Sequence, residues 1–220
     1  MPIKLAEEVF IMAEKNITEA LQTENIEIDL LITAIKRKIG YDLSGYARAS
    51  IKRRIEYLVI DEGVNCIADL IPKLLYSQKC QANFINQLTV NLSELFRHPI
   101  SFLSLRESVL PYLASFPRRD IWIAGCATGE EAYSMAILLE EVGLLNNTQI
   151  HATDINTEVL KQAKTGILTN GLNKEDAVRY QASGGISSLS NYFSTAYNKH
   201  KLSQHLLEHI SFSHHNLLQD

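Results

Sequence analysis

The sequence has little of what marks secreted, membrane-spanning or nucleic-acid-binding proteins. Its three cysteines, Cys66, Cys80 and Cys126, form no C-x-x-C pair, so we expect no disulfide framework and favour a reducing, cytoplasmic setting. No apolar run approaches the roughly 20 residues that span a bilayer, and acidic residues interrupt the amino terminus too early for a secretory signal. With 21 basic and 25 acidic residues, the chain is predicted neither to bind nucleic acid in bulk nor to insert into membranes.

Helical spacing of apolar residues dominates the first part of the chain, and residues 1–88 are predicted to form an all-helical domain. Helical runs cover residues 5–21 and 28–39, and Gly40 follows as a stop signal. Ser44 is expected to cap the next helix, which ends near Gly63 and turns inward Ile51, Ile55, Leu58 and Val59. Further periodic runs cover residues 66–75 and 81–88.

A cluster of positive charge interrupts this otherwise acidic protein. Arg48, Lys52, Arg53 and Arg54 fall within seven residues. One interpretation is an ordinary solvated helix face. The other is a docking surface for an acidic helical partner, because complementary charge raises encounter rates and selects partners.

The rest of the chain is organised around residues 120–155. An apolar strand over 120–125 leads into a turn of small residues, a helix is expected from Glu130, and a second strand over 149–153 ends on Asp154. Gly125 and Gly129 allow a sharp turn that a ligand can approach closely, and the helix presents free N–H groups there. Asp154 can accept hydroxyls of a ribose, as acidic residues at this position of dinucleotide sites do.

Two carboxylates at the helix start restrict the class of ligand. Glu130 and Glu131 would repel a pyrophosphate, which needs the positive end of the helix dipole, so a nicotinamide enzyme is disfavoured. A ligand with positive charge suits them, and S-adenosylmethionine carries an ammonium and a sulfonium. Cys126 is interpreted as a small filler of the turn, since free cysteines usually pack as apolar groups.

Beyond Asp154, the sequence predicts one more helix and one more strand. Asn156 or Thr157 can cap a helix over 158–164 that ends at Gly166, and residues 210–214 alternate as a third strand. Residues 167–195 are rich in Ser, Gly and Asn and are expected to be irregular and at the surface. His205 and His209 are expected on one helix, but no third ligand is placed to complete a metal site with them. We therefore expect these two histidines, and His214 and His215, to be solvated side chains.

Several motifs in order resemble one family. They are Asn-Leu-Ser-Glu-Leu-Phe-Arg (91–97), Gly-Cys-Ala-Thr-Gly-Glu-Glu-Ala-Tyr-Ser (125–134), Ala-Thr-Asp-Ile-Asn (152–156) and His-Asn-Leu-Leu (215–218). Together with Tyr-Asp-Leu-Ser-Gly-Tyr (41–46) and Ile-Lys-Arg-Arg-Ile (51–55), they are similar to the CheR family of chemotaxis receptor methyltransferases. The resemblance implies an α/β chain: an all-helical amino-terminal domain, then a Rossmann-like methyltransferase domain over 89–220, its sheet incomplete at the carboxyl end.

The resemblance also implies a site and a reaction. S-adenosylmethionine would be bound and converted to S-adenosylhomocysteine as receptor glutamates are methylated. Arg97 would lie beside the transferred methyl group, and Arg53 and Arg54 on the surface that meets receptor helices. The matched cofactor-binding positions are Asn91, Ser93, Arg97, Gly125, Glu130, Asp154, Asn216 and Leu217.

Plainer alternatives stay open at this stage. Arg97 could form a structural salt bridge, and Asn91 and Ser93 could be turn residues. Because CheR-like domains continue through four more strands, we expect weak or absent methyl transfer by these 220 residues alone. The alternative function is a CheR-like binding module that holds a receptor or cofactor without turnover.

Overall fold

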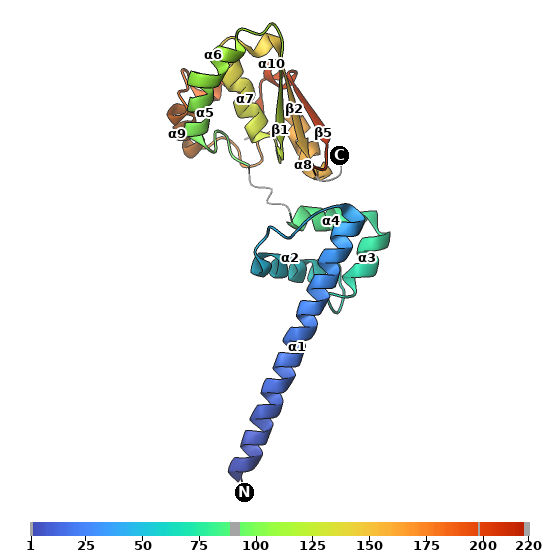
Figure 1. Cartoon of the computed structure of the whole chain (residues 1–220). Coiled ribbons are helices and arrows are strands. Elements are labelled where there is room, and N and C mark those ends of the chain that lie inside the picture. The colour runs from blue at the N-terminus through green and yellow to red at the C-terminus, as the bar shows by residue number, and fades with distance from the viewer. Residues whose placement is uncertain (1, 89–92, 198, 218–220) are drawn as a thin grey trace. The chain divides into compact units, whose positions relative to one another are not determined.

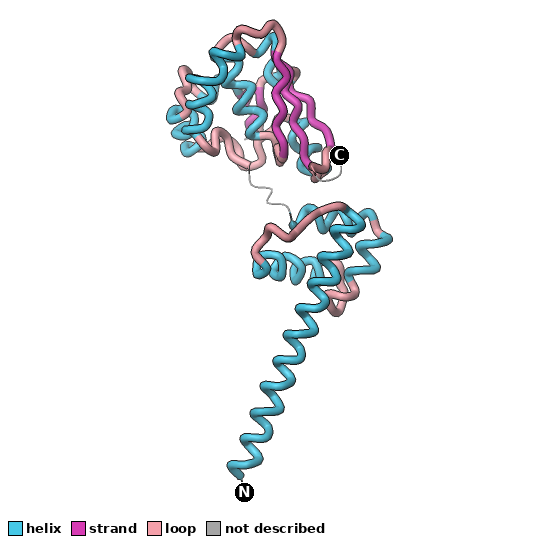
Figure 2. The backbone as a smooth tube through the Cα atoms, in the orientation of Figure 1, coloured by secondary structure: helices cyan, strands magenta, loops and turns pink. Residues whose placement is uncertain are grey.

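The computed structural model describes residues 2–88, 93–197 and 199–217 (Figure 1). The chain forms two compact units, residues 1–88 and residues from 89 onward. Figure 2 shows helices and loops in the described part of the first unit and both helices and strands in the second. The predicted α/β class with a helical amino-terminal part is therefore confirmed.

The first unit packs short helices against one long helix. Its elements are α1 (Pro2–Ile39), α2 (Arg48–Asp61), α3 (Leu70–Tyr76) and α4 (Gln78–Leu88). Their apolar faces meet in one cluster, and burial of each such side chain is worth about 1.5–3 kcal/mol. The buried members are Ile28, Leu31, Ile35, Leu43, Ile51, Ile55, Leu58, Ile67, Leu70, Leu74 and Phe84.

Two sequence expectations for this unit need correction. The runs over 5–21 and 28–39 belong to one continuous helix, because no Gly or Pro separates them. Ser44 does not cap α2: Ala47 precedes the helix and no side-chain cap is formed there, whereas the Ser44 N–H donates to Asp42 Oδ1 at 2.9 Å. The stop signals are confirmed, with Gly40 at φ 76° and Gly63 at φ 61° just beyond their helices.

The second unit is built on a parallel sheet that places the predicted strands side by side. β1 (Arg119–Ala124), β2 (Thr148–Asp154) and β5 (Ile210–His214) pair in the order β1-β2-β5. One face is buried through Ile123, Ile150, Ala152, Ile210 and Phe212. The other face exposes alternate residues, among them Trp122, which is 57% exposed. Because the three strands are parallel, their carboxyl ends meet at one edge of the sheet.

Two crossover helices join these strands on the buried face. α7 (Glu130–Glu141) follows β1, and α8 (Thr157–Thr165) follows β2. The two helices contact each other where Tyr133 Oη donates to the Ala163 carbonyl at 2.6 Å. The predicted cap of α8 is confirmed: Asn156 Oδ1 accepts from the Glu158 and Val159 N–H groups.

Shorter elements complete the second unit. In chain order they are α5 (Pro99–Ser104), η1 (Leu105–Val109), α6 (Leu110–Leu113), η2 (Leu145–Asn147), α9 (Lys174–Ala182), η3 (Leu189–Tyr192), β3 (Phe193–Ala196), β4 (Lys199–Leu202) and α10 (Gln204–Leu207). β3 and β4 form a separate antiparallel pair. The expectation that His205 and His209 share a helix is wrong, because α10 ends at Leu207 and His209 Nδ1 lies 3.2 Å from the Thr148 carbonyl oxygen.

The prediction of an irregular surface segment over 167–195 is also wrong. α9 begins with a capping box between Asn173 and Asp176, and Tyr180 on this helix is fully buried. The Gly-Gly pair that suggested a loop has a packing reason, since a Cβ on Gly185 would collide with the Tyr180 ring. Small residues here let the chain pass closely over an aromatic side chain.

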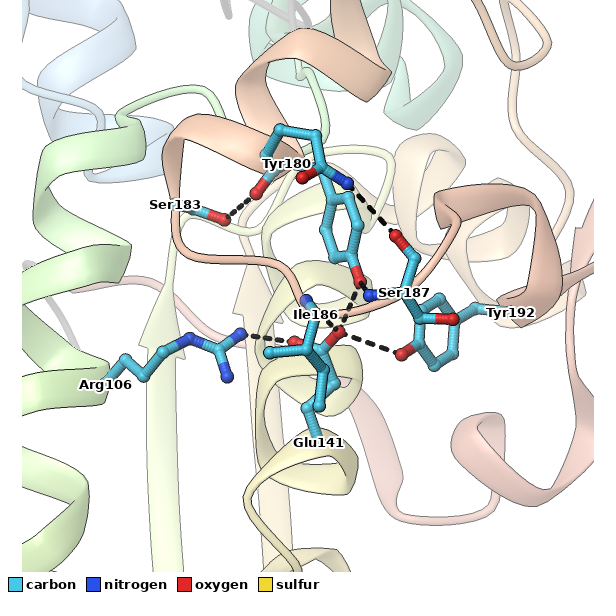
Figure 3. A network of polar contacts seen from close by, with 8 residues as sticks. Arg106, Glu141, Tyr180, Ser183, Ile186, Ser187 and Tyr192 are labelled. Atoms are coloured by element: carbon cyan, nitrogen blue, oxygen red, sulfur yellow. Dashed lines mark hydrogen bonds and ion pairs between the residues drawn. The ribbon is translucent and has the colours of Figure 1, made fainter.

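A buried carboxylate fixes this segment to α7 (Figure 3). The Glu141 side chain is 1% exposed and pairs with Arg106 from η1. Tyr180 Oη donates to it, as do Tyr192 Oη at 2.9 Å and the Ile186 N–H at 3.2 Å. Burial by itself raises the pKa of Glu141, but these hydrogen bonds outweigh it and hold the pKa below its ordinary value. Glu141 is therefore ionised, and it links α7 to η1, α9 and η3.

Candidate functional site

The turn after β1 is shaped by three residues with positive φ. Gly125 has φ 76°, Ala127 has φ 46° and Gly129 has φ 100°. A Cβ on Gly129 would lie 2.8 Å from Tyr133 Cζ, so only glycine fits there without displacing a buried ring. A Cβ on Gly125 would meet nothing within 4 Å, so the backbone at this point is open to a ligand.

Asp154 stands at the end of β2 and holds this turn in place. Its Oδ2 accepts from the Ala127 N–H at 2.9 Å, and its Oδ1 accepts from the Asn156 N–H at 2.8 Å. A carboxylate has about four acceptor positions, so both oxygens can still accept ligand hydroxyls. The sequence predicted the ligand-facing role but missed this second role in ordering the turn.

Glu130 begins α7 and is almost fully buried, with 6% of the residue exposed. Thr128 Oγ1 donates to Glu130 Oε2 at 2.6 Å. Burial raises the pKa of Glu130, and hydrogen bonds from Thr128 and Ser93 offset only part of that effect. A cationic ligand group nearby would favour the ionised form of this carboxylate.

The segment before α5 brings Arg97 to a cleft beside the glycine turn. This cleft has a volume of about 360 Å³, within the range of small-molecule sites. Arg97 is exposed at the cleft, and Glu131 from α7 lines it as well. The full lining is Ser93, Glu94, Arg97, His98, Ser101, Phe102, Leu105, Gly125, Ala127, Glu131 and Met135.

A second, smaller cleft of about 70 Å³ adjoins the same segment. Ser93 lines both clefts, whereas Glu130 lines only the smaller one. Glu94, Glu175 and Asp176 add carboxylates there, and Arg179 adds a guanidinium. The two glutamates at the start of α7 therefore face different spaces, which their adjacency in sequence did not predict.

The predicted cofactor residues are only partly brought together. Ser93, Arg97 and Gly125 share the larger cleft, and Ser93 contacts Glu130. Among the described residues, Asp154, Asn216 and Leu217 line neither cleft, although Asp154 touches the turn and its carbonyl accepts from the His215 N–H at 3.1 Å. Asn216 is buried and Leu217 is 60% exposed. Asn91 lies outside the described residues.

Three side chains with evident roles at the site were missed by sequence reasoning. Ser134 accepts a hydrogen bond from the Phe96 N–H at 2.9 Å, beside Arg97. Arg179 donates to the Leu95 carbonyl at 2.9 Å. Thr128 holds Glu130. Ser134 and Thr128 lie within the quoted 125–134 motif, whereas Arg179 lies in the segment predicted to be irregular.

Two nucleophile-like features are structural. Cys126 is buried, and that burial raises the pKa of its thiol to about 12, so its thiolate is scarce at neutral pH. Asp120, His151 and Ser211 meet on the exposed face of the sheet, with His151 Nε2 3.0 Å from Asp120 and Nδ1 3.2 Å from Ser211. The carboxylate faces Nε2 and the hydroxyl Nδ1, the reverse of a hydrolase triad, so this is a cross-strand hydrogen-bond network.

The basic cluster of the first unit is largely engaged within its own unit. Arg48 pairs with Asp29 at 2.6 Å, Lys52 pairs with Glu24 at 2.6 Å, and Arg54 donates to the Gln87 carbonyl at 3.1 Å. Arg53 is exposed. One and two helical turns further, Tyr57 is 59% exposed and Ile60 is 76% exposed. The three form one outward stripe of α2.

Comparison with known proteins agrees with the motifs. Residues 26–89 match the family described as CheR methyltransferase, all-alpha domain, and residues 91–220 match CheR methyltransferase, SAM binding domain. A protein of Pseudomonas putida named "Putative methyltransferase Cher3" is 40% identical over 196 residues, covering 89% of this chain and 72% of that protein.

Two more distant relatives carry the name chemotaxis protein methyltransferase. The one from Listeria monocytogenes is 31% identical over 134 residues, covering 60% of this chain and 51% of that protein. The one from Salmonella typhimurium is 29% identical over 216 residues, covering 92% and 69%. In the described residues, no helix is both long and apolar enough to cross a membrane.

One assignment follows from the helical unit, the glycine turn with its carboxylates and the two matched domains. The chain belongs to the CheR methyltransferase family, and its second unit is that family's S-adenosylmethionine-binding domain.

Proposed function

We propose that this chain binds S-adenosylmethionine at the glycine turn and that the protein methylates glutamate side chains of chemotaxis receptors. The single observation that carries the proposal is the shared cleft of Ser93, Arg97 and Gly125 beside the carboxylates of α7. The chain spans 72% of the Pseudomonas putida relative and about half of the Listeria one, so the activity of the whole protein is inferred here.

The residues present suit this cofactor. The open backbone at Gly125 admits a ligand, and the carboxylate of Asp154 keeps acceptor positions for ribose hydroxyls. The buried Glu130 carboxylate suits the ammonium of the methionyl portion. A pyrophosphate would meet two carboxylates at the same helix start, which argues against a dinucleotide.

The proposed reaction places few chemical demands on the protein. When bound, S-adenosylmethionine supplies a methyl group on a sulfonium; a receptor carboxylate oxygen gains the C–O bond as the C–S bond breaks, and no proton moves. A glutamate with pKa near ~4.3 is already ionised at neutral pH, so no general base is needed. The residues must instead orient the partners, which can contribute roughly 7–11 kcal/mol.

Arg97 is the residue we assign to hold the receptor carboxylate. An arginine guanidinium presents a planar donor fork that matches the two oxygens of a carboxylate. The exposed position of Arg97 at the cleft lets it meet a macromolecular substrate.

Receptor docking is assigned to the outward stripe of α2. Arg53, Tyr57 and Ile60 combine a cation with exposed aromatic and apolar surface, the composition of binding hot spots. Arg48, Lys52 and Arg54, which the sequence grouped with Arg53, already bond to Asp29, Glu24 and Gln87 and contribute less to docking.

The experiment is a methyl-transfer assay with radiolabelled S-adenosylmethionine and receptor-containing membranes, run beside calorimetric titration with S-adenosylhomocysteine. We expect saturable cofactor binding and base-labile label on receptor glutamates; Arg97→Lys should lower transfer at least tenfold with little change in cofactor affinity. Weak transfer by these 220 residues alone stays a prediction.

Two further calorimetric titrations, one with receptor fragments and one with NADH, separate the alternatives. Receptor binding without cofactor binding would replace the proposal with a docking module. Binding of NADH in place of S-adenosylhomocysteine would replace it with a nicotinamide enzyme.

A further inference from the structure

The backbone next to Arg97 adopts a conformation that its own sequence does not favour. Phe96 has φ 50°, in the left-handed region that bulky residues rarely occupy. A residue stays in such a region only when its surroundings hold it there, and such residues concentrate at functional sites. The contacts of Phe96 therefore fix the position of the backbone from which the Arg97 side chain extends.

Those contacts come from three helices, α5, α7 and α9. The Phe96 N–H donates to Ser134 Oγ on α7 at 2.9 Å, and Ser134 Oγ in turn donates to the Glu130 carbonyl at 2.7 Å. The Phe96 ring is fully buried between Phe102, with ring centroids 5.1 Å apart, and Tyr180 of α9, at 5.3 Å.

The residues before Phe96 are fixed by two of these helices, α7 and α9. Arg179 of α9 donates to the Leu95 carbonyl at 2.9 Å, and its guanidinium lies 3.6 Å from Glu94. Ser93 bonds to Glu130 at the start of α7. Ser134 is 0% exposed, and its hydroxyl donates one hydrogen bond and accepts one in this arrangement.

We propose that Ser134 is a positioning residue: its hydroxyl ties the backbone at Phe96 to α7 and so sets Arg97 at the cleft. α7 also carries Glu130 and Glu131 and begins at the glycine turn, so this bond ties the backbone beside Arg97 directly to the helix that carries these carboxylates. The inference rests on the proposed function for its catalytic consequence, but its structural part is independent of it.

The test is amide hydrogen exchange at Phe96, measured by NMR on the full chain. In the wild-type protein, this loop amide should exchange at least tenfold more slowly than an unprotected amide. Ser134→Ala should raise its rate at least tenfold and speed tryptic cleavage at the Arg97–His98 bond, while amides in the middle of α7 keep their rates.

The control is Ser183→Ala. Ser183 is also 0% exposed and its Oγ donates to the Tyr180 carbonyl at 2.6 Å, so the variant removes a similar buried hydroxyl without touching Phe96. It should leave the Phe96 amide unchanged. In the transfer assay, Ser134→Ala should lower kcat at least tenfold at unchanged affinity for S-adenosylhomocysteine, a split that general destabilisation would not give.

Three outcomes would overturn the inference: rapid exchange of the Phe96 amide in the wild-type protein, equal effects of the two serine variants on that amide, or full kcat in Ser134→Ala. Weak or absent transfer by the wild-type chain is what we expect of these 220 residues alone, and the exchange measurement would then decide the role of Ser134. Absence of S-adenosylhomocysteine binding would count against the proposed function.

Discussion

At the scale of single residues, the site depends on which glycines are free and which are packed. Gly129 and Gly125 both have positive φ, but a side chain at Gly129 would strike the Tyr133 ring, whereas one at Gly125 would enter open space. We therefore expect the two glycines of one turn to serve different purposes, Gly129 in folding and Gly125 in ligand approach.

This contrast predicts opposite profiles for two alanine variants. Gly129→Ala should destabilise the protein by about 2–4 kcal/mol, because left-handed strain of about 1–2 kcal/mol is added to overpacking. Gly125→Ala should lower the free energy of unfolding only by the left-handed strain, but it should weaken S-adenosylhomocysteine binding at least tenfold. Urea unfolding and calorimetric titration measure the two effects; equal stability losses with intact binding in Gly125→Ala would contradict the account.

At the scale of elements, local patterns predicted those parts whose partners are close in sequence. Apolar runs predicted strands over 120–125 and 149–153, and the structure has them at 119–124 and 148–154. Glycine spacing and capping chemistry predicted the turn, α7 and the Asn156 cap. α9 was missed because its stability comes from distant contacts: Tyr180 reaches Glu141 across 39 positions, and Ser and Gly around it resemble a loop.

The buried carboxylate that anchors α9 gives a prediction for this element. Glu141→Gln should destabilise the second unit by about 3–5 kcal/mol, because the partly buried guanidinium of Arg106 loses its counter-charge. In this variant, the rate of amide hydrogen exchange should rise first in residues 183–192. Glu140→Gln is the matched control: this neighbour is 41% exposed and should change stability by less than about 1 kcal/mol. Similar losses in both variants would refute this role for Glu141.

The loop between α1 and α2 gives a pH prediction. The hydrogen bond from Lys36 and that from the Ser44 N–H lower the pKa of Asp42 from 3.8 to about 2. Because the folded-state pKa is depressed, the stabilisation is present above pH 3.8 and is lost as pH falls through about 2.

Asp42→Asn should therefore destabilise the helical unit at neutral pH, and its difference from wild type should shrink between pH 4 and pH 2. Urea midpoints followed by far-ultraviolet circular dichroism measure this difference. A gap that stays constant down to pH 2 would show that the carboxylate charge contributes nothing.

At the scale of the whole molecule, we propose that recognition of a partner and chemistry lie on different units. The exposed stripe of Arg53, Tyr57 and Ile60 belongs to the first unit, and the cleft that we assign to the cofactor belongs to the second. The sequence identified the basic cluster but not which of its members are available, since Arg48 and Lys52 find partners 19 and 28 positions away.

Charge reversal on each unit tests this separation. Arg53→Glu should lower binding to receptor membranes at least fivefold at low salt, with the effect fading at high salt, because exposed charges are screened. Its affinity for S-adenosylhomocysteine should equal that of wild type. Arg118→Glu, whose side chain is 78% exposed on the second unit, is the control and should bind receptors normally. Equal losses in both variants would mean that net charge, not the stripe on α2, governs docking.

Calorimetric titration of the full chain with S-adenosylhomocysteine decides whether the turn after β1 holds S-adenosylmethionine. We expect one saturable site per chain that is weakened at least tenfold by Glu130→Gln and by Asp154→Asn. No binding, or binding that both variants leave unchanged, would contradict this expectation.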